Sequence, residues 1–211
     1  MSQADTLLAV LRASPVLPVA AVEDPATAVN LARALAAGGL KTLEITLKTA
    51  AGLDCIRAIA GEGEDIALGA GGVRDPRRYE AAANAGAAFV SAREATPELI
   101  QAARGSTMPL LPGVTTAGEA MALAEHGYRL LKFFPVEAAG GVAYVKALAV
   151  ALPAIGFCPT GGIGARAAAA YLGLANVVTV GGSWVAPATA IRAGDWARIT
   201  RLAAKAAALR G

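Results

Sequence analysis

The chain has 211 residues, of which 55% are hydrophobic and 17% charged, so it can bury a large core, and we expect a single domain over residues 1–211. The net charge is only +3 and the basic residues are scattered, which argues against a nucleic-acid partner and suits a small anionic ligand. Two distant cysteines, Cys55 and Cys158, form no metal-binding spacing, so we expect reduced thiols in a cytoplasmic protein.

The N-terminal sequence MSQADTLLAVLRASP predicts an amphipathic helix with Ser2 or Asp5 as its cap. It lacks the basic segment and the small-residue cleavage site of a signal peptide. The longest uncharged stretch, residues 148–165, is interrupted by prolines and glycines, so we expect no membrane-spanning helix and no membrane partner.

Short runs rich in β-branched and aromatic residues then alternate with amphipathic runs rich in alanine and leucine. The predicted strands cover residues 16–22, 42–48, 66–73, 87–93, 109–116, 129–135, 156–162 and 177–184. The predicted helices lie near residues 26–37, 50–61, 76–85, 97–104, 117–126, 142–151, 165–173 and 195–209.

Helix boundaries carry their own signals in this pattern. An aspartate or threonine followed by proline marks three helix starts, at residues 24–25, 75–76 and 96–97. The repeating strand and helix, roughly 22 residues long, predicts an α/β protein of the (β/α)₈ TIM-barrel class, preceded by an N-terminal helix. A doubly wound open sheet is the competing arrangement. In a barrel, the functional residues lie at the carboxyl ends of the strands.

Few residue types are available for catalysis. The one histidine, His126, falls at the predicted end of a helix, where a cationic ring would complement the helix dipole, so no Ser-His-Asp or Cys-His arrangement is expected. A zinc site with several histidines is excluded, and no cluster of acidic residues suggests another metal site. We therefore expect no metal and no cofactor.

Two ionisable residues, Glu44 and Lys132, stand out because each lies within an apolar strand, where an unpaired charge is costly. They could form a buried salt bridge of purely structural importance, or point outward between the helices. A desolvated lysine can instead lose its proton and attack a ketone to form a Schiff base, while a buried carboxylate moves protons. Lys132 and Glu44 would form such a pair if they meet inside the barrel.

Two glycine-rich turns follow the last two predicted strands, in CPTGGI and VGGSW. Backbone N–H groups at residues 161–162 and 181–182, with the hydroxyl of Ser183, can approach an anion closely, and residues 187–194 can supply a short helix beside them. The corresponding loops of many barrels bind phosphate, so we expect a phosphate site here.

The segments LEITLK, LLKFFPVEAAGG, FCPTGGI and VGGSW closely resemble the KDPG/KHG aldolase family, the 2-keto-3-deoxy-6-phosphogluconate (KDPG) aldolases, over nearly the whole chain. The resemblance implies a cytoplasmic class I aldolase of the Entner–Doudoroff pathway, a homotrimer that needs no metal. It implies cleavage of the phosphorylated keto-deoxy acid to pyruvate and glyceraldehyde 3-phosphate, and in many members also cleavage of 4-hydroxy-2-oxoglutarate.

Residue by residue, the resemblance makes Lys132 the Schiff-base lysine and Glu44 the proton-transferring glutamate. The substrate-binding positions that we expect are Lys48, Gly72, Arg93, Thr160, Gly161, Gly162, Gly182 and Ser183.

Three departures from the family pattern lie on the carboxylate-binding side. Lys48 replaces a common arginine, Gly72 replaces a threonine, and Arg93-Glu94 replaces the Pro-Gly of an SPG motif. Arg93 could bind the substrate carboxylate, or Arg93 and Glu94 could pair and narrow the mouth of the pocket. Two alternatives therefore stay open: a related pyruvate-dependent aldolase with altered specificity, and a catalytically weakened or engineered barrel that serves as a scaffold.

Overall fold

The computed structural model of the protein describes residues 2–49 and 51–210. The strands are β1 (Val16–Ala20), β2 (Thr42–Thr46), β3 (Ala67–Gly71), β4 (Phe89–Ser91), β5 (Leu110–Leu111), β6 (Gly113–Val114), β7 (Leu130–Phe133), β8 (Gly156–Pro159) and β9 (Val180–Gly182). The helices are α1 (Gln3–Arg12), α2 (Pro25–Ala37), α3 (Ala51–Gly61), α4 (Pro76–Asn84), α5 (Pro97–Arg104), α6 (Ala117–Glu125), α7 (Gly141–Ala151), α8 (Ala165–Leu172), α9 (Ala188–Ala193) and α10 (Trp196–Ala207), followed by the 3₁₀ turn η1 (Ala208–Arg210).

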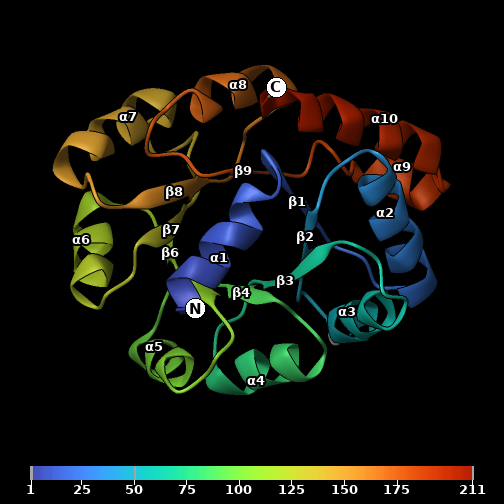
Figure 1. Ribbon diagram of the computed structural model, residues 1–211, viewed down its shortest axis with the longest axis horizontal. Helices are drawn as coiled ribbons and strands as arrows, with labels where there is room; N and C mark the ends of the chain where they lie inside the picture. The colour runs from blue at the N-terminus through green and yellow to red at the C-terminus, as the bar shows by residue number, and fades with distance from the viewer. Residues whose placement is uncertain (1, 50, 211) are drawn as a thin grey trace.

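The strands form a curled parallel sheet, with α2 to α10 around its outside (Figure 1). One part has the order β5-β4-β3-β2-β1-β9 and the other β6-β7-β8, and every pair of neighbours is parallel. The alternation of strands and helices predicted from the sequence is therefore confirmed.

The predicted strand 109–116 is divided at Pro112 into β5 and β6. Proline has no N–H to donate to a neighbouring strand, so the regular ladder is interrupted there. The Pro112 carbonyl still accepts a hydrogen bond from the Lys132 backbone N–H at 2.9 Å, which keeps this segment beside β7.

The helix starts follow the predicted caps. Asp24, Asp75 and Thr96 each accept a hydrogen bond from the backbone N–H three residues later, with proline in the first helical turn. Ser2 caps α1 and Asp5 completes a reciprocal capping box, so both candidates named for that helix take part.

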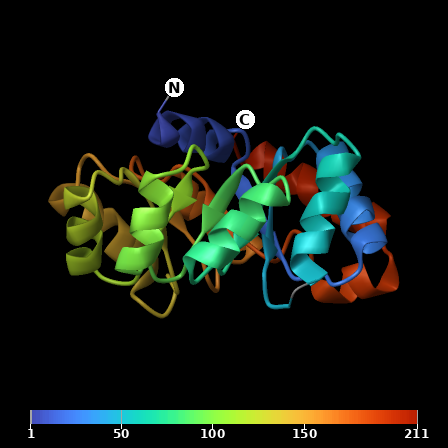
Figure 2. The same ribbon diagram turned by 90° about the horizontal axis from the view of Figure 1, so that it is seen from below.

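Helix α1 lies across one end of the curled sheet (Figures 1 and 2). Its Leu7 and Leu11 are buried in a cluster with residues near the beginnings of strands, among them Leu17, Phe89 and Leu130. The amino ends of the strands are thus closed by α1, and the carboxyl ends stay open on the other side.

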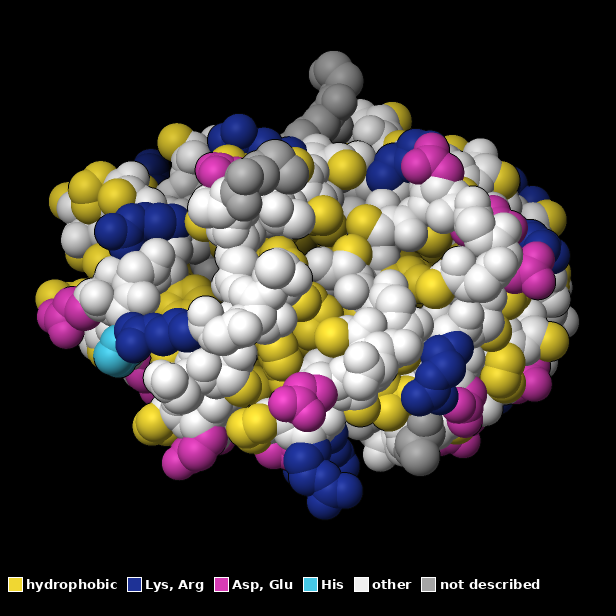
Figure 3. Space-filling view, turned by 60° about the horizontal axis from the view of Figure 1, so that its bottom comes forward, with side chains coloured by type: hydrophobic (Ala, Val, Ile, Leu, Met, Phe, Trp, Pro, Cys, Tyr) yellow, Lys and Arg dark blue, Asp and Glu magenta, His cyan; other side chains and the backbone are white. Residues whose placement is uncertain are grey.

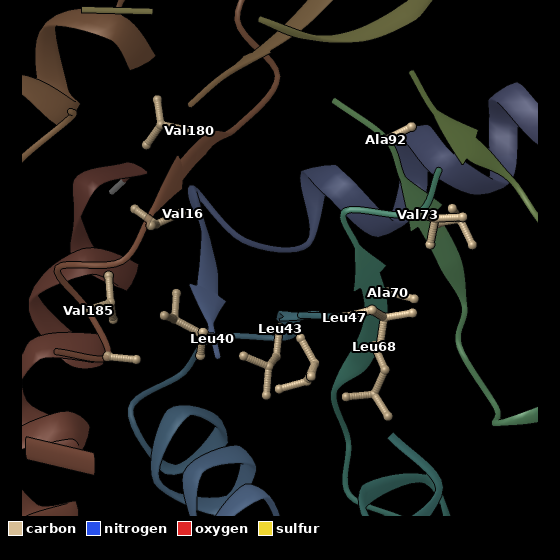
Figure 4. Close-up of a cluster of buried hydrophobic side chains, with 14 of the residues drawn as sticks. Val16, Leu40, Leu43, Leu47, Leu68, Ala70, Val73, Ala92, Val180 and Val185 are labelled. Carbon is tan, nitrogen blue, oxygen red and sulfur yellow. The ribbon is translucent and has the colours of Figure 1, made fainter. Parts of the chain in front are cut away.

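A larger core separates the strands from the outer helices (Figure 4). Leu43 and Ile45 point into this core and are fully buried. Because side chains alternate along a strand, Glu44 between them points to the inside of the curled sheet. Within residues 2–49 and 51–210, no helix is long and apolar enough to cross a membrane.

Candidate active site

Lys132 on β7 and Glu44 on β2 meet inside the curled sheet. Lys132 Nζ donates to both carboxylate oxygens of Glu44, at 2.7 and 2.9 Å. The side chains are only 7% and 2% exposed. Both the expected meeting of the pair and its burial are therefore confirmed. The proton that a lysine must lose before attacking a ketone has an acceptor in direct contact.

Ser91, the last residue of β4, completes this cluster. Its hydroxyl donates to Glu44 Oε2 at 2.9 Å and accepts from Lys132 Nζ at 3.2 Å. The sequence analysis did not single out Ser91, although a hydroxyl at the end of an apolar strand was visible in AAFVSAR. Ser91 fixes the rotamer of Glu44, so the carboxylate faces the amine with both of its oxygens.

The backbone beside Glu44 must remain free of side chains. A Cβ on Gly71 would collide with the Glu44 carboxylate, so glycine at the end of β3 makes room for it. Gly72 follows with φ of 72°, in the left-handed region that favours glycine. Position 72, where the family pattern has a threonine, therefore has a backbone conformation in this chain that disfavours a β-branched residue.

Cys158 and Thr160 line the inside of the sheet next to Lys132. Cys158 is the strand partner of Lys132 and is 1% exposed. Burial raises the pKa of Cys158 to about 11, against the lowering effect of the nearby Lys132 charge. Its thiol is therefore neutral at ordinary pH. The Thr160 hydroxyl donates to the Cys158 carbonyl at 3.2 Å.

The two predicted anion-binding turns lie side by side. Thr160 and Gly181 form a parallel β-bridge, which joins the ends of β8 and β9. Gly161 and Gly162 have φ of 101° and 85°, so both need glycine. Ser183 is exposed after β9, where its hydroxyl can reach a ligand. This geometry suits recognition of a phosphate through backbone N–H groups.

The loop after β7 is attached to the first of these turns. Backbone N–H groups of Val136 and Glu137 donate to the carbonyls of Thr160 and Gly161, at 2.9 and 3.3 Å. The hydroxyl of the buried Tyr171 donates to Glu137 Oε1 at 2.6 Å. Burial and the adjoining carboxylate raise the pKa of Tyr171, so it remains a hydrogen-bond donor.

The remaining predicted residues lie on the opposite side of the opening. Lys48, Gly72 and Arg93 line one surface pocket of about 670 Å³ at the carboxyl ends of β2, β3 and β4. Arg93 forms no ion pair with Glu94 in the structure, so the pairing that would narrow the mouth is not found. Its guanidinium instead lies 4.9 Å from the centre of the Phe134 ring.

His126 lies outside this site. It caps the end of α6, and its Nδ1 is 3.1 Å from Arg104 Nη2. Arginine can only donate, so Nδ1 is the acceptor in this contact, and the predicted place of His126 at the end of a helix is confirmed (Figure 3). Among the described residues, no group of three or more histidine, cysteine or acidic side chains could hold a metal ion.

Known proteins are similar to this chain over most of its length. Residues 7–202 match the KDPG and KHG aldolase family. The chain is 47% identical to a 2-dehydro-3-deoxy-phosphogluconate aldolase of Pseudomonas aeruginosa, covering 92% of this chain and 89% of the relative. It is 44% identical to a KHG/KDPG aldolase of Escherichia coli K12, covering 93% and 92%.

A solved structure is similar over almost its whole length. The KDPG aldolase of Legionella pneumophila, with pyruvate captured at low pH as a covalent carbinolamine intermediate, superposes with a TM-score of 0.92. The two chains are 40% identical, and the match covers 95% of this chain and 97% of the other.

Proposed function

This chain belongs to the KDPG and KHG aldolase family, and we propose that Lys132 and Glu44 are the catalytic residues by which it acts as a class I aldolase. The enzyme is a carbon–carbon lyase that cleaves 2-dehydro-3-deoxy-6-phosphogluconate into pyruvate and D-glyceraldehyde 3-phosphate. The observation that carries the assignment of residues is the buried contact between Lys132 Nζ and both oxygens of Glu44.

The first half of the reaction forms the Schiff base. Lys132 transfers a proton to Glu44, and its amine attacks the ketone carbon to give a carbinolamine. Glu44 returns the proton to the hydroxyl on that carbon, which leaves as water, so a protonated Schiff base remains. Ser91 holds the carboxylate in position for both transfers.

The second half breaks the carbon–carbon bond. Glu44, again a carboxylate, removes the proton of the C4 hydroxyl while the C3–C4 bond breaks and its electrons pass to the iminium. The aldehyde departs and an enamine of pyruvate stays on Lys132. Glu44 then protonates C3, and water hydrolyses the Schiff base to release pyruvate. All proton transfers use one carboxylate, and the sequence of steps consumes no cofactor.

Substrate recognition is divided between the two sides of the opening. We assign the phosphate to the turns after β8 and β9, with Thr160, Gly161, Gly162, Gly182 and Ser183 around it. The left-handed glycines and the accessible Ser183 hydroxyl support this assignment. Lys48, Gly72 and Arg93 are assigned to the carboxylate end, a role supported by the cationic pocket that they line.

The two parts of the sheet are inferred to form one closed (β/α)₈ barrel over a single domain, residues 1–211. Two observations support closure. Only Pro112 separates β5 from β6, and two parallel bridges, Phe157–Val177 and Thr160–Gly181, link the β8 and β9 segments.

The assembly and location proposed for the enzyme are a homotrimer in the cytoplasm. Met121 on α6 and Val150 on α7 are 53% and 86% exposed, and burial of such residues between subunits would favour assembly. Light scattering of the purified protein tests the trimer, and a monomer mass would contradict it.

Borohydride reduction in the presence of pyruvate tests the assignment of Lys132. A mass increase on the peptide containing Lys132, absent from Lys132→Ala, is the expected result. A trapped adduct on another lysine would overturn the assignment. The turnover assay couples release of glyceraldehyde 3-phosphate to a dehydrogenase, and the same variant should lose turnover.

A second activity, cleavage of 4-hydroxy-2-oxoglutarate to pyruvate and glyoxylate, is favoured by the match to the KHG/KDPG aldolase of E. coli. Comparing turnover on the phosphorylated and unphosphorylated acids measures how much the glycine turns contribute. Equal specificity constants would contradict the phosphate assignment.

A further inference from the structure

A basic pocket lies beside the catalytic pair, and it contains more positive charge than one substrate carboxylate requires. The basic pocket is defined as the pocket whose charged lining residues are Lys48, Arg74, Arg78, Arg93 and Glu94. Its volume of about 670 Å³ corresponds to roughly 11 Å across, close to the Debye length of about 10 Å at 0.1 M salt. All four cations line one pocket, so an anion with two negative charges can contact more than one of them.

These cations are poorly neutralised by the protein. Lys48, Arg74 and Arg93 form no ion pair with the carboxylates of the described residues. Arg78 has one weak pair, with Nε 3.8 Å from Asp75 Oδ2. Like charges gathered in one concave surface repel one another, and a bound anion relieves that repulsion.

Arg93 contacts an aromatic ring and has no carboxylate partner among the described residues. Its guanidinium lies 4.9 Å from the centre of the Phe134 ring, a cation–π contact. Because this guanidinium forms no ion pair among the described residues, its N–H groups are available to an oxyanion.

The basic pocket adjoins the catalytic chamber. Thr46 and Gly72 line it, and each comes shortly after a residue of the chamber wall, Glu44 on β2 and Gly71 on β3. A Cβ on Gly71 would touch the Glu44 carboxylate, so Gly71 faces the chamber while its chain neighbour Gly72 lines the pocket. An anion in the pocket therefore occupies the expected carboxylate position of the substrate.

We propose that the basic pocket is a binding site for a free oxyanion with two negative charges, of the phosphate or dicarboxylate class. Such an anion excludes the carboxylate of the ketone substrate and so inhibits the enzyme competitively. Arg74 and Arg78 extend the site beyond the residues assigned to substrate, and they supply the affinity for the second charge. The inhibition rests on the proposed function, whereas the binding itself does not.

Inhibition is measured by borohydride trapping of pyruvate at increasing inorganic phosphate, with sodium chloride used to match ionic strength. Pyruvate carries no phosphate, so its trapping does not report on the glycine turns. Phosphate should raise the pyruvate concentration for half-maximal trapping without lowering the maximum, and malonate should do the same.

The double variant Arg74→Ala/Arg78→Ala isolates the site. Losing a hydrogen bond between charged groups weakens binding about 10-fold or more, so the inhibition constant for phosphate should rise at least tenfold. Trapping without phosphate should change less than about twofold, because the single carboxylate of pyruvate is assigned to Lys48, Gly72 and Arg93 and not to these two arginines. The matched control is Arg77→Ala, a charge removed from the same helix outside the basic pocket, which should leave inhibition unchanged.

Calorimetric titration of phosphate into the protein separates the two proposals. The glycine turns are also expected to bind phosphate, so the proposal concerns one binding event in the titration. That event should be present in the parent and in Arg77→Ala and missing from the double variant, even if no pyruvate adduct forms. Phosphate with no effect beyond that of chloride, or equal inhibition of the double variant and the parent, overturns the inference. Thermal unfolding verifies that each variant is folded.

Discussion

Replacing Lys132 by methionine should destabilise the protein strongly, because it removes one partner of a buried ion pair. Glu44 is 2% exposed at its side chain and would keep only the hydrogen bond from Ser91. Breaking such a pair on one side costs about 3–5 kcal/mol. For a chain of this size each kcal/mol lowers Tm by about 2–4 °C, so a decrease of roughly 10 °C is expected.

A double-mutant cycle shows whether the charge of Glu44 is the cause. In Glu44→Gln/Lys132→Met neither charge remains, and replacing a whole buried pair is often close to neutral. The double variant should therefore be more stable than Lys132→Met alone, with an interaction energy of about 2 kcal/mol or more. Urea unfolding followed by circular dichroism at one protein concentration gives all four free energies.

One control makes this cycle decisive. Lys146→Met, a substitution of an exposed lysine of α7, should change the free energy of unfolding by less than about 0.5 kcal/mol. A single variant within about 1 kcal/mol of the parent, or strictly additive single effects, would refute the reasoning.

Variants at three further positions test the surroundings of the pair. Gly72→Thr should lower stability by about 1–3 kcal/mol in thermal unfolding, because a β-branched residue is strained at φ of 72°, and Gly72→Asn should lose less. Tyr171→Phe removes the hydroxyl that holds Glu137, so KM for the phosphorylated acid should rise several-fold. The kinetic constants for 4-hydroxy-2-oxoglutarate should stay unchanged, and an equal rise of KM for both substrates would contradict the prediction. Burial raises the pKa of Cys158 from 9.0 to about 11, so the neutral thiol contributes to the free energy of unfolding below pH 9. This contribution is lost as the pH rises to 11, by up to about 1.4 kcal/mol per pH unit. Cys158→Ser should abolish this part of the alkaline loss in urea titrations, and an unchanged slope would contradict it.

The sequence predicted the features that depend on local pattern. Side chains alternate along a strand, so TLEIT places Glu44 on the face opposite Leu43 and Ile45, and LLKF places Lys132 opposite Leu131 and Phe133. Asp24-Pro25 predicted the start of α2 to within one residue, because the cap and the proline affect only the first turn of the helix that they begin.

Features that arise where distant segments meet were not predictable in this way. Ser91 joins the catalytic pair only because β4 lies on the path between β2 and β7 around the sheet. Arg74 and Arg78 carry no motif, and they acquire a common ligand space only when the loops after β2, β3 and β4 come together. Long side chains on adjacent loops have many rotamers, so their contacts cannot be predicted from their spacing in the sequence.

The position of Phe134 explains how one opening can serve two anionic ends of a substrate. Its ring lies 4.9 Å from the Arg93 guanidinium, and a Cβ on Gly161 would lie 2.9 Å from the same ring. Phe134 therefore stands between the basic pocket and the phosphate turns, two residues after Lys132. A keto acid has its carboxylate next to the ketone carbon, whereas its phosphate is several bonds away. The proposed attack by Lys132 on the ketone carbon therefore suits this opening, which has the basic pocket on one side of Phe134 and the glycine turns on the other.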